Sequence, residues 1–314
     1  MIDLKKKKIL VTGAHGFLGK HLIKNLLEKR QVPKENLYTP TANELDLRNF
    51  ENCKKAAKGQ NIIIHLAAIV GGIGFNLEHP GIAFYDNAAM ALNLLEAARQ
   101  EGIEKFTGIG SVCEYPKEIP MPYQEEDLWS GYPEETNAPY GLAKKFMLVQ
   151  SQAYRKEYNL NAIHLLMLNL YGPGDNFDPK SSHVIPALIK KIEDAKKEGK
   201  NYIEAWGTGK PTREFFYVED AAEGIILATE KYDKVDPINL GSGKEISITE
   251  LLELLCELMS FKGEIRWDAT KPDGQPRRFF ETSKAQKEFG FFAKTDLKEG
   301  LQKTIEDYKN RNKI

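Results

Sequence analysis

The stretch Val11-Thr12-Gly13-Ala14-His15-Gly16-Phe17-Leu18-Gly19 decides the fold. It ends the apolar run of residues 8–13 and leads into residues 19–30, whose leucines recur at helical spacing. Glycines at 13, 16 and 19 let the backbone turn sharply and approach a pyrophosphate, which the free N–H groups of the following helix attract. The Gly-x-x-Gly-x-x-Gly spacing in this position predicts a dinucleotide-binding strand, turn and helix.

Strand and helix patterns alternate through the rest of the first half. Further strands are predicted at residues 36–38, 61–68, 105–111 and 161–172, and helices at residues 83–102 and 138–158. The apolar residues of 61–68 run on without alternating, which is typical of a strand buried on both faces. This alternation predicts an α/β protein with a Rossmann-type, doubly wound parallel sheet.

The pattern loosens after about residue 172, where turn formers fill residues 173–186. Helices are predicted at residues 183–199 and 248–260, a strand and helix at 213–230, and a loop at 271–282. There are no internal repeats and no low-complexity linker. We therefore expect a dinucleotide-binding domain of residues 1–172 plus about 214–242. A smaller α/β C-terminal substrate lobe would comprise residues 173–213 and 243–314.

The composition is that of an ordinary globular protein: 314 residues, 41% hydrophobic and 28% charged, with a net charge of −1. This balance predicts no nucleic-acid or membrane partner. The three cysteines, Cys53, Cys113 and Cys256, are far apart and form no Cys-x-x-Cys pair, so neither a disulfide framework nor a metal site is predicted. No apolar run approaches the roughly 20 residues of a membrane span, and no signal-peptide pattern is present. We expect a soluble, cytoplasmic protein.

A tyrosine and a lysine stand four residues apart in Pro139-Tyr140-Gly141-Leu142-Ala143-Lys144, at the start of a predicted helix. Residues at this spacing share a helix face, and an ammonium group can lower the pKa of a phenol. Such a tyrosine can give or take a proton while hydride moves to or from a nicotinamide. Ser111, at the end of the preceding strand, could bind the same oxygen. The alternative is a tyrosine and lysine on an ordinary amphipathic helix.

The segment that contains Ser111 reads Gly110-Ser111-Val112-Cys113-Glu114-Tyr115-Pro116. If the chain is still extended there, Ser111 and Cys113 point the same way, because side chains two apart share a strand face. The serine and the thiol would then face one substrate. The alternative is that Cys113 is a small buried hydrophobic residue.

Over nearly its whole length the chain resembles the GDP-L-fucose synthase family of extended short-chain dehydrogenases/reductases. The resemblance is carried by residues 65–73, 110–117, 135–145, 169–191, 206–220, 240–251 and 271–278. The stretch DNFDPKSSHVIPALI at 175–189 is the most specific. Sugar-nucleotide 4-epimerases and 4,6-dehydratases share the glycine loop and the tyrosine–lysine pair but do not usually carry this stretch.

That family epimerises C3 and C5 of GDP-4-keto-6-deoxymannose and then reduces the C4 ketone with NADPH. The resemblance implies that Ser111, Tyr140 and Lys144 carry the reduction, with Cys113 as base and His183 as acid for the epimerisations. It implies cofactor contacts from Gly13, Gly16, Phe17, Leu18, Gly19, Ala67, Ser111, Tyr140, Lys144, Asn169 and His183. It implies sugar-nucleotide contacts from Asn169, Lys191, Trp206, Arg213 and Asp273. A homodimer is also expected from the resemblance.

The chain departs from the family in two places. The family typically reads Ser-Ser-Cys-Ile-Tyr-Pro where this chain has Val112 and the acid Glu114 around Cys113. His15 stands where some relatives carry an arginine, and residues 38–47 supply neither an acid at the strand end nor the relatives' arginines. We expect NADP as cofactor, with NAD left open; Lys20, Lys29 and Arg30 are possible sources of positive charge.

These motifs are consistent with four functional hypotheses. The first is a bifunctional epimerase and reductase of a GDP-linked 4-keto sugar. The second is a C4 reductase alone, acting on a GDP-4-keto heptose or another 4-keto sugar. The third is a redox-neutral sugar-nucleotide 4-epimerase that keeps NAD bound. The fourth is a non-catalytic dinucleotide sensor, which would have no need of the Ser111, Tyr140 and Lys144 set.

Overall fold

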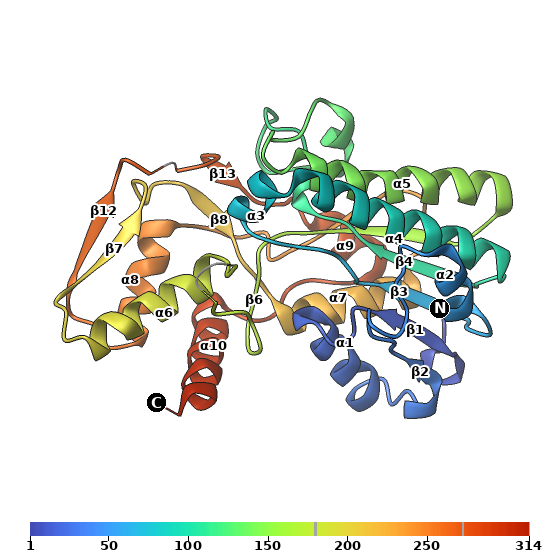
Figure 1. The fold of residues 1–314 in the computed structure, drawn as a ribbon, viewed down its shortest axis with the longest axis horizontal. Coiled ribbons are helices and arrows are strands. Elements are labelled where there is room, and N and C mark those ends of the chain that lie inside the picture. The colour runs from blue at the N-terminus through green and yellow to red at the C-terminus, as the bar shows by residue number, and fades with distance from the viewer. Residues whose placement is uncertain (179–180, 272, 314) are drawn as a thin grey trace.

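The protein is built on a six-stranded parallel sheet with helices on both faces, and a smaller α/β lobe extends from one end (Figure 1). The computed structural model describes residues 1–178, 181–271 and 273–313. The strand order is β10-β5-β4-β3-β1-β2, and every neighbouring pair is parallel. The predicted Rossmann-type fold is therefore confirmed.

The elements of the sheet and its two helical layers follow in chain order. The strands are β1 (Ile9–Thr12), β2 (Leu37–Tyr38), β3 (Ile62–His65), β4 (Lys105–Ile109), β5 (Ala162–Met167) and β10 (Ile238–Leu240). The helices are α1 (Phe17–Glu28), α2 (Phe50–Ala57), α3 (Ile73–Glu78), α4 (Pro80–Gln100), α5 (Ala138–Tyr158), α7 (Val218–Lys231) and α9 (Ser283–Phe289). Short 3-10 turns are η1 (Leu4–Lys6), η2 (Lys34–Asn36), η3 (Val112–Glu114) and η4 (Glu125–Trp129).

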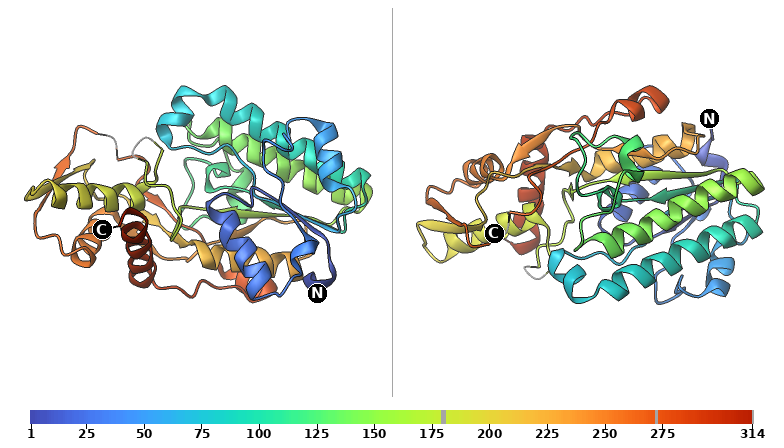
Figure 2. Two further views of the ribbon diagram at one scale, coloured as in Figure 1. Left: turned by 60° about the horizontal axis from the view of Figure 1, so that its bottom comes forward. Right: turned by 90° about the horizontal axis from the view of Figure 1, so that it is seen from above.

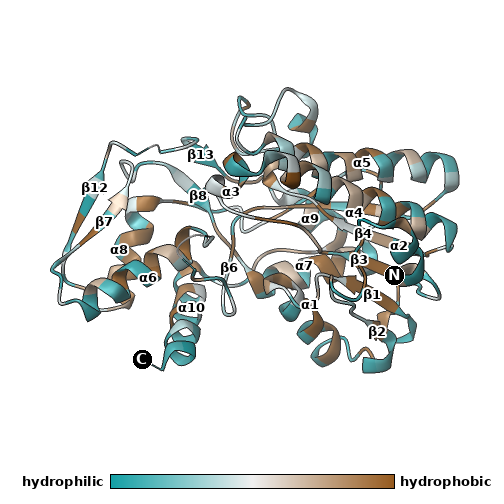
Figure 3. Cartoon of the chain, in the orientation of Figure 1, coloured by the Kyte–Doolittle hydropathy of each residue, from teal (hydrophilic) through white to brown (hydrophobic). Residues whose placement is uncertain are grey.

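The sheet is buried on both faces, as the unbroken apolar runs predict. On β1, Ile9 and Val11 join a core with α1 and α7, whereas Leu10 joins a second core with α2, α4 and α5. Figure 2 shows these two layers on opposite sides of the sheet. Figure 3 shows the resulting pattern, with hydrophobic residues concentrated in the strands and hydrophilic residues at the outer ends of the helices.

The lobe has its own hydrophobic core, formed largely by three helices. Its elements are α6 (Val184–Lys197), α8 (Ile248–Leu258), α10 (Leu297–Asn312), β7 (Tyr202–Trp206), β8 (Thr212–Glu214), β11 (Glu245–Ser247), β12 (Glu264–Asp268) and β13 (Arg277–Arg278). A separate two-stranded sheet consists of β6 (Leu170–Tyr171) and β9 (Phe216–Tyr217). Leucine and isoleucine side chains of α6, α8 and α10 meet against β7. The domain boundaries given above stay a prediction.

Two predicted elements differ from the structure. Residues 271–282, expected as a loop, contain β13, which pairs in parallel with β8. Residues 161–172, expected as one strand, divide into β5 in the main sheet and β6, which pairs with β9. Both differences arise from pairing with distant strands, which a local pattern does not reveal. Among the described residues, no helix has both the length and the apolar character needed to cross a membrane.

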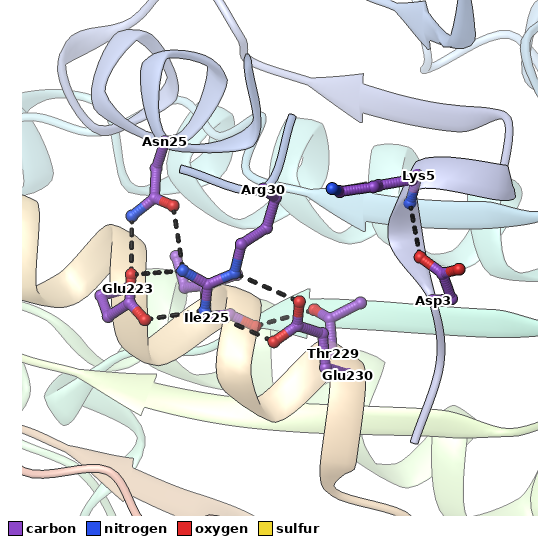
Figure 4. Close-up of polar contacts among 8 residues, drawn as sticks. All are labelled: Asp3, Lys5, Asn25, Arg30, Glu223, Ile225, Thr229 and Glu230. Carbon is purple, nitrogen blue, oxygen red and sulfur yellow. Dashed lines mark hydrogen bonds and ion pairs between the residues drawn. The ribbon is translucent and has the colours of Figure 1, made fainter. Parts of the chain in front are cut away.

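Arg30 fastens α1 to α7 rather than facing the glycine loop. Its guanidinium donates two hydrogen bonds to Glu223, at 2.8 and 2.7 Å, and another to Glu230 at 3.2 Å. Asn25 donates to Glu223 at 2.9 Å, which completes the network in Figure 4. Burial alone would raise the pKa of Glu223, but the hydrogen bonds from Arg30 and Asn25 outweigh it and hold that pKa below its usual value.

Replacing Arg30 by methionine should lower the free energy of unfolding by about 1–3 kcal/mol, because two partly buried carboxylates lose their counter-charge. The contribution of a carboxylate whose pKa is lowered in the folded state is present above its unfolded pKa and is lost as the pH falls. The difference between Arg30→Met and the wild type should therefore shrink on acidification. Urea unfolding at several pH values would measure it, with Lys24→Met on the exposed face of α1 as the control. An equal effect of both substitutions would contradict this interpretation.

Candidate active site

The glycine loop connects β1 to α1 with no room for side chains at two of its positions. Gly13 has φ +72°, and a Cβ there would lie 2.8 Å from Ala67 N. A Cβ at Gly19 would collide with the carbonyl of Gly13. Gly16 is the N-cap of α1 and has no side chain with which to cap that helix. This cradle, with uncapped N–H groups at the start of α1, fits the pyrophosphate of a dinucleotide.

The end of β2, where the adenosine ribose of a dinucleotide would be read, is linked to the glycine loop through His15. His15 Nε2 lies 3.0 Å from the carbonyl oxygen of Thr39, which follows β2 directly. Glu44 accepts hydrogen bonds from Thr41 N at 2.7 Å and Thr41 Oγ1 at 2.8 Å, and it interacts electrostatically with His15. The residues here are therefore a histidine, threonines and one carboxylate.

Ser111 and Cys113 lie on a tight turn, so the extended chain on which a shared strand face depended is not present. Val112–Glu114 form a 3-10 turn for which Ser111 is the N-cap. Ser111 Oγ accepts a hydrogen bond from Cys113 N at 3.2 Å, and the Glu114 carboxylate accepts one from Ser111 N at 2.8 Å. This reciprocal capping box fixes the turn.

Helix α5 packs its first turn directly onto this segment. A Cβ at Gly141 would collide with the carbonyl of Cys113 and would lie 3.3 Å from Glu114 N. The close approach brings Tyr140 to hydrogen-bonding range of Ser111. The ammonium of Lys144 lies 5.9 Å from the centre of the Tyr140 ring. The turn and the helix thus bring together Ser111, Cys113, Tyr140 and Lys144.

Burial dominates the acid–base properties of this cluster. It raises the pKa of Tyr140, with further raising by Cys113 and Glu114 and an opposing effect of the hydrogen bond with Ser111. Burial lowers the pKa of Lys144 to about 8, against an opposing effect of Glu114. The expected lowering of the phenol pKa by Lys144 is therefore not seen in the free protein. A tyrosine with a raised pKa stays protonated and can donate a proton at neutral pH.

Arg278, which the sequence analysis missed, lies close to the thiol. Its Nη2 is 4.0 Å from Cys113 Sγ, and its Nε is buried without a hydrogen-bond partner among the described residues. Tyr123, fully buried, interacts with both Arg278 and Cys113. A guanidinium at this distance stabilises negative charge on sulfur. Arg278 lies on β13, in the segment that was expected to be a loop.

A second arginine lies beside Arg278. Arg213 and Arg278 are direct neighbours across the β8–β13 ladder. Arg213 Nη1 donates to the carbonyl of Thr212 at 2.7 Å. Burial and the charge of Arg278 lower the pKa of Arg213 to about 10. Two partly desolvated guanidinium groups side by side favour a ligand with multiple negative charges.

The other predicted sugar-nucleotide residues lie around β7. Trp206 ends β7 and is 70% exposed, so its ring is available for stacking. Lys191 donates to the carbonyl of Glu204 at 2.6 Å. Asp273 accepts hydrogen bonds from Thr208 N at 2.6 Å and Thr208 Oγ1 at 2.7 Å, and its carbonyl accepts one from Arg213. Both carboxylate oxygens of Asp273 thus hold the turn after Trp206.

Asn169 and His183 line one small pocket with the start of α6. Asn169 follows β5, and its side chain donates to the carbonyl of Glu214 at 2.9 Å. His183 is the N-cap residue of α6 and is exposed. A separate hollow, lined by Asp175, Tyr308 and Arg311 among others, contains none of the predicted site residues.

Comparisons with known proteins agree with this geometry. The model of the NAD dependent epimerase/dehydratase family matches residues 9–241. GDP-L-fucose synthase 1 of Arabidopsis thaliana is 37% identical over 306 residues, which cover 97% of this chain and 94% of the plant protein. GDP-L-colitose synthase of Yersinia pseudotuberculosis is 36% identical, with 96% of this chain and 98% of that protein covered. The structure of MlghC, a GDP-mannoheptose C4 reductase from Campylobacter jejuni with NADP bound, superimposes with a TM-score of 0.88 at 27% identity, covering 97% of this chain and 99% of that one.

The match of the family model extends from β1 to the residue after β10, so it spans the glycine loop, the capped turn and the tyrosine–lysine helix. The likeness to the two sugar-nucleotide synthases extends into the lobe that carries Trp206 and Arg213. The chain therefore belongs to the NAD dependent epimerase/dehydratase family and, within it, groups with the GDP-L-fucose synthases.

Proposed function

We propose that the protein reduces the C4 ketone of a GDP-linked 4-keto sugar with a nicotinamide cofactor, after epimerising the flanking carbons C3 and C5. One observation carries this proposal: Ser111 and Cys113 share a capped turn that packs against Tyr140 and Lys144, with Arg278 at the sulfur. Reduction at a carbonyl needs a proton donor, and epimerisation beside it needs a base. The turn supplies the proposed base, Cys113, and the helix packed against it supplies the proposed proton donor, Tyr140.

Reduction is assigned to Ser111, Tyr140 and Lys144. The glycine loop and the start of α1 would hold the nicotinamide cofactor, whose chemistry would be to supply hydride to C4. Tyr140 donates the proton that the C4 oxygen takes up, which its raised pKa permits at neutral pH. Ser111 would donate a hydrogen bond to the same oxygen once the sugar is bound, because its own oxygen accepts from Cys113 N and its hydroxyl proton can turn from Tyr140 to the substrate. Lys144 provides positive charge as negative charge develops on Tyr140.

Epimerisation is assigned to Cys113 and His183. The protons at C3 and C5 are acidic because each carbon adjoins the C4 carbonyl. Cys113 as thiolate removes one of these protons, and Arg278 stabilises the negative sulfur. His183 returns a proton to the opposite face of the carbon and is replenished from solvent, to which it is exposed. Neither step consumes an oxidant or a reductant.

The nucleotide is assigned to the cationic and aromatic groups of the lobe. Arg213, with Arg278 beside it, suits the two phosphates of GDP because guanidinium forks bind oxygen pairs. Trp206 offers an exposed ring for the guanine. Lys191 adds a partly buried positive charge near the end of β7. Asp273 would act by holding the turn after Trp206 in place.

NADP is the proposed cofactor, and the NADP bound to MlghC supports it. His15 is the group in the glycine loop that can carry positive charge toward a 2′-phosphate, since it bridges to Thr39 at the end of β2. NAD is the alternative, favoured by the Glu44 carboxylate close to His15. NADP carries a 2′-phosphate that would lie near His15, and NAD does not. Kinetics with the two cofactors can therefore distinguish the two assignments.

We also propose that the protein is a cytoplasmic homodimer. The outward sides of α4 and α5 expose apolar side chains that a monomer would leave in water: Ile82, Tyr85, Phe146 and Val149, each at least 44% exposed. The two helices lie side by side along one face of the molecule in Figures 1 and 2. Exposed apolar side chains gathered on one face favour burial against a second copy. Free cysteines at positions 53, 113 and 256 suit a reducing compartment.

Turnover of GDP-4-keto-6-deoxymannose with NADPH in deuterated water should place solvent deuterium at both C3 and C5 of a C4-reduced product. Mass spectrometry would locate the label. Cys113→Ser should lower the rate of label incorporation by about 10²–10⁴-fold, the usual contribution of a positioned base. Tyr140→Phe is the matched variant: it should keep incorporating label while losing reduction.

Reduction by the wild type without carbon-bound deuterium would leave a C4 reductase and refute the epimerase assignment. Bound NAD that is not exchanged, with no net oxidation of NADPH, would favour the 4-epimerase. A GDP-4-keto heptose would be offered next if the 6-deoxy sugar were not consumed.

His15→Ala should raise the KM for NADPH about fivefold, the effect of losing about 1 kcal/mol from one exposed, charge-assisted contact. The KM for NADH should change little, because NADH lacks the 2′-phosphate. Steady-state kinetics with both cofactors would measure the ratio, and Lys24→Ala would serve as the surface control. A wild-type enzyme that prefers NADH would show the NADP assignment to be wrong.

Val149→Lys should convert the dimer into a monomer, because it places a charge in the apolar face of α5. Sedimentation equilibrium of the wild type and the variant would show the change. Phe292→Lys is the matched control, since Phe292 is 55% exposed but lies outside α4 and α5. A wild type that sediments as a monomer at all concentrations would contradict the proposed dimer.

A further inference from the structure

An ionisable pair is buried directly behind the reductive residues. Glu114 on η3 is fully buried, and His164 on β5 is 1% exposed. His164 Nε2 lies 3.1 Å from both carboxylate oxygens of Glu114, and one of those oxygens also accepts the hydrogen bond from Ser111 N at 2.8 Å. Glu114 thus connects the interior of the sheet to the backbone of a proposed catalytic residue.

The two side chains pack so closely against the backbone at Gly110 that no side chain fits at that position. A Cβ at Gly110 would collide with both Glu114 Oε1 and His164 Nε2. On the other side of the turn, the Cβ excluded at Gly141 would strike the backbone of Cys113. The carboxylate is therefore enclosed between β5 and α5 and is fully buried.

The pair carries a net negative charge when His164 is neutral. His164 Nδ1 is buried without a hydrogen-bond partner among the described residues. A proton on that atom would be unsatisfied, so the hydrogen-bond network assigns the ring proton to Nε2, where it donates to the carboxylate. The hydrogen bonds from His164 Nε2 hold the Glu114 carboxyl group in place.

Several other titratable groups face Glu114 or its neighbours. Cys113 and Tyr115 lie on its own segment, and Tyr140, Lys144 and Lys145 face it from α5. His65, on β3, faces Lys144 and is held by Thr12 Oγ1 at 2.8 Å; burial lowers the pKa of His65 to about 3, so it is neutral.

The two cations in this group have different surroundings. Lys145 donates to the carbonyl of Leu128 at 2.5 Å and lies over the ring of Trp129. Lys144 is the cation that belongs to the reductive cluster, and it is 96% buried. Burial opposes the charge on Lys144, whereas Glu114 favours it. The carboxylate is thus the buried counter-charge to the proposed catalytic lysine.

We propose that Glu114, held by His164, is a positioning residue of the reductive site: it locks the Ser111 turn and keeps Lys144 charged. Burying a carboxylate costs free energy even where it is hydrogen-bonded, so the position of Glu114 calls for an account beyond packing. The kinetic part of the proposal rests on the reductase function proposed above. The electrostatic part concerns the protein and its cofactor alone.

The expected direction of the effect follows from the charges. The negative charge of Glu114 raises the pKa of both Lys144 and Tyr140. Removing that charge should lower both, so the protonated form needed for reduction is lost at lower pH. In Glu114→Gln the basic limb of the pH profile for reduction should move down by about one pH unit, a typical effect of one nearby charge. The amide oxygen can still accept from Ser111 N, so the turn is retained.

The first measurement uses the intact enzyme and a GDP-4-keto sugar, with single-turnover reduction followed from pH 6 upward. The second needs no sugar: the Kd for NADPH is measured against pH by fluorescence, because Lys144 is among the proposed cofactor contacts. The fall in affinity at high pH should also begin about one unit lower in Glu114→Gln. If no sugar is turned over, the second measurement still tests the inference.

Glu125→Gln is the matched control. Glu125 is a buried carboxylate on η4 that accepts from Asn239 N at 2.9 Å, away from Lys144. Its neutralisation should leave both profiles in place. His164→Phe should shift them in the same direction as Glu114→Gln, because a carboxylate without its donor takes up a proton. The double variant should add no further shift.

The inference is overturned if both profiles of a folded Glu114→Gln protein superimpose on those of the wild type, since the pair would then be only structural. A shift to higher pH would equally refute it. If Glu114→Gln does not fold, His164→Phe decides the question by the same measurements, with thermal unfolding recorded for each variant.

Discussion

The absence of side chains at Gly110 and Gly141 is the constraint on which the candidate site depends. Both positions lie where a Cβ would penetrate neighbouring atoms: the buried pair in one case and the Cys113 carbonyl in the other. The end of β4 can therefore enter a tight turn squeezed between β5 and α5. Because the turn and the helix cannot separate without opening a cavity, Ser111 and Tyr140 keep one relative position. The proposed reductive residues are therefore positioned by the packing of this turn against β5 and α5.

Several positively charged side chains of the candidate site are partly or fully removed from water. Burial lowers the pKa of Lys144 to about 8 and that of Arg213 to about 10, and it also lowers the pKa of Lys191. Each of these groups costs stability in the free protein, because charge is removed from water. An anionic ligand would offset this loss of stability. The effect would be largest where two positively charged side chains are close together. The unfavourable electrostatics of the free protein are thus a form of preorganisation for a negatively charged ligand.

Local signals account for what the sequence could predict. The glycine spacing predicted β1 and α1, and the apolar runs predicted a sheet buried on both faces. These features depend on residues that are close together in the sequence. The turn at Ser111 was readable too, since Ser-x-x-Glu is a capping-box pattern, yet a strand was expected there. Arg278 and His164 carried no local signal. Arg278 is placed near Cys113 by the pairing of β13 with β8. His164 lies within β5 and contacts Glu114 in the turn that follows the neighbouring strand β4.

The contact between Arg278 on β13 and Cys113 joins the lobe to the turn that follows β4. Side chains opposite each other in a ladder lie on the same face, and like charges in such a position repel. Arg213 and Arg278 are in this arrangement, and the buried Glu214 beside them offers no relief. Its carboxylate is already occupied by the backbone of Ser242, Gly243 and Phe280. A diphosphate bound between the arginines would remove the repulsion. Because Arg278 also lies 4.0 Å from Cys113 Sγ, the lobe that would bind the nucleotide would also supply the positive charge beside the proposed base. Binding and the first chemical step would then depend on the same side chain.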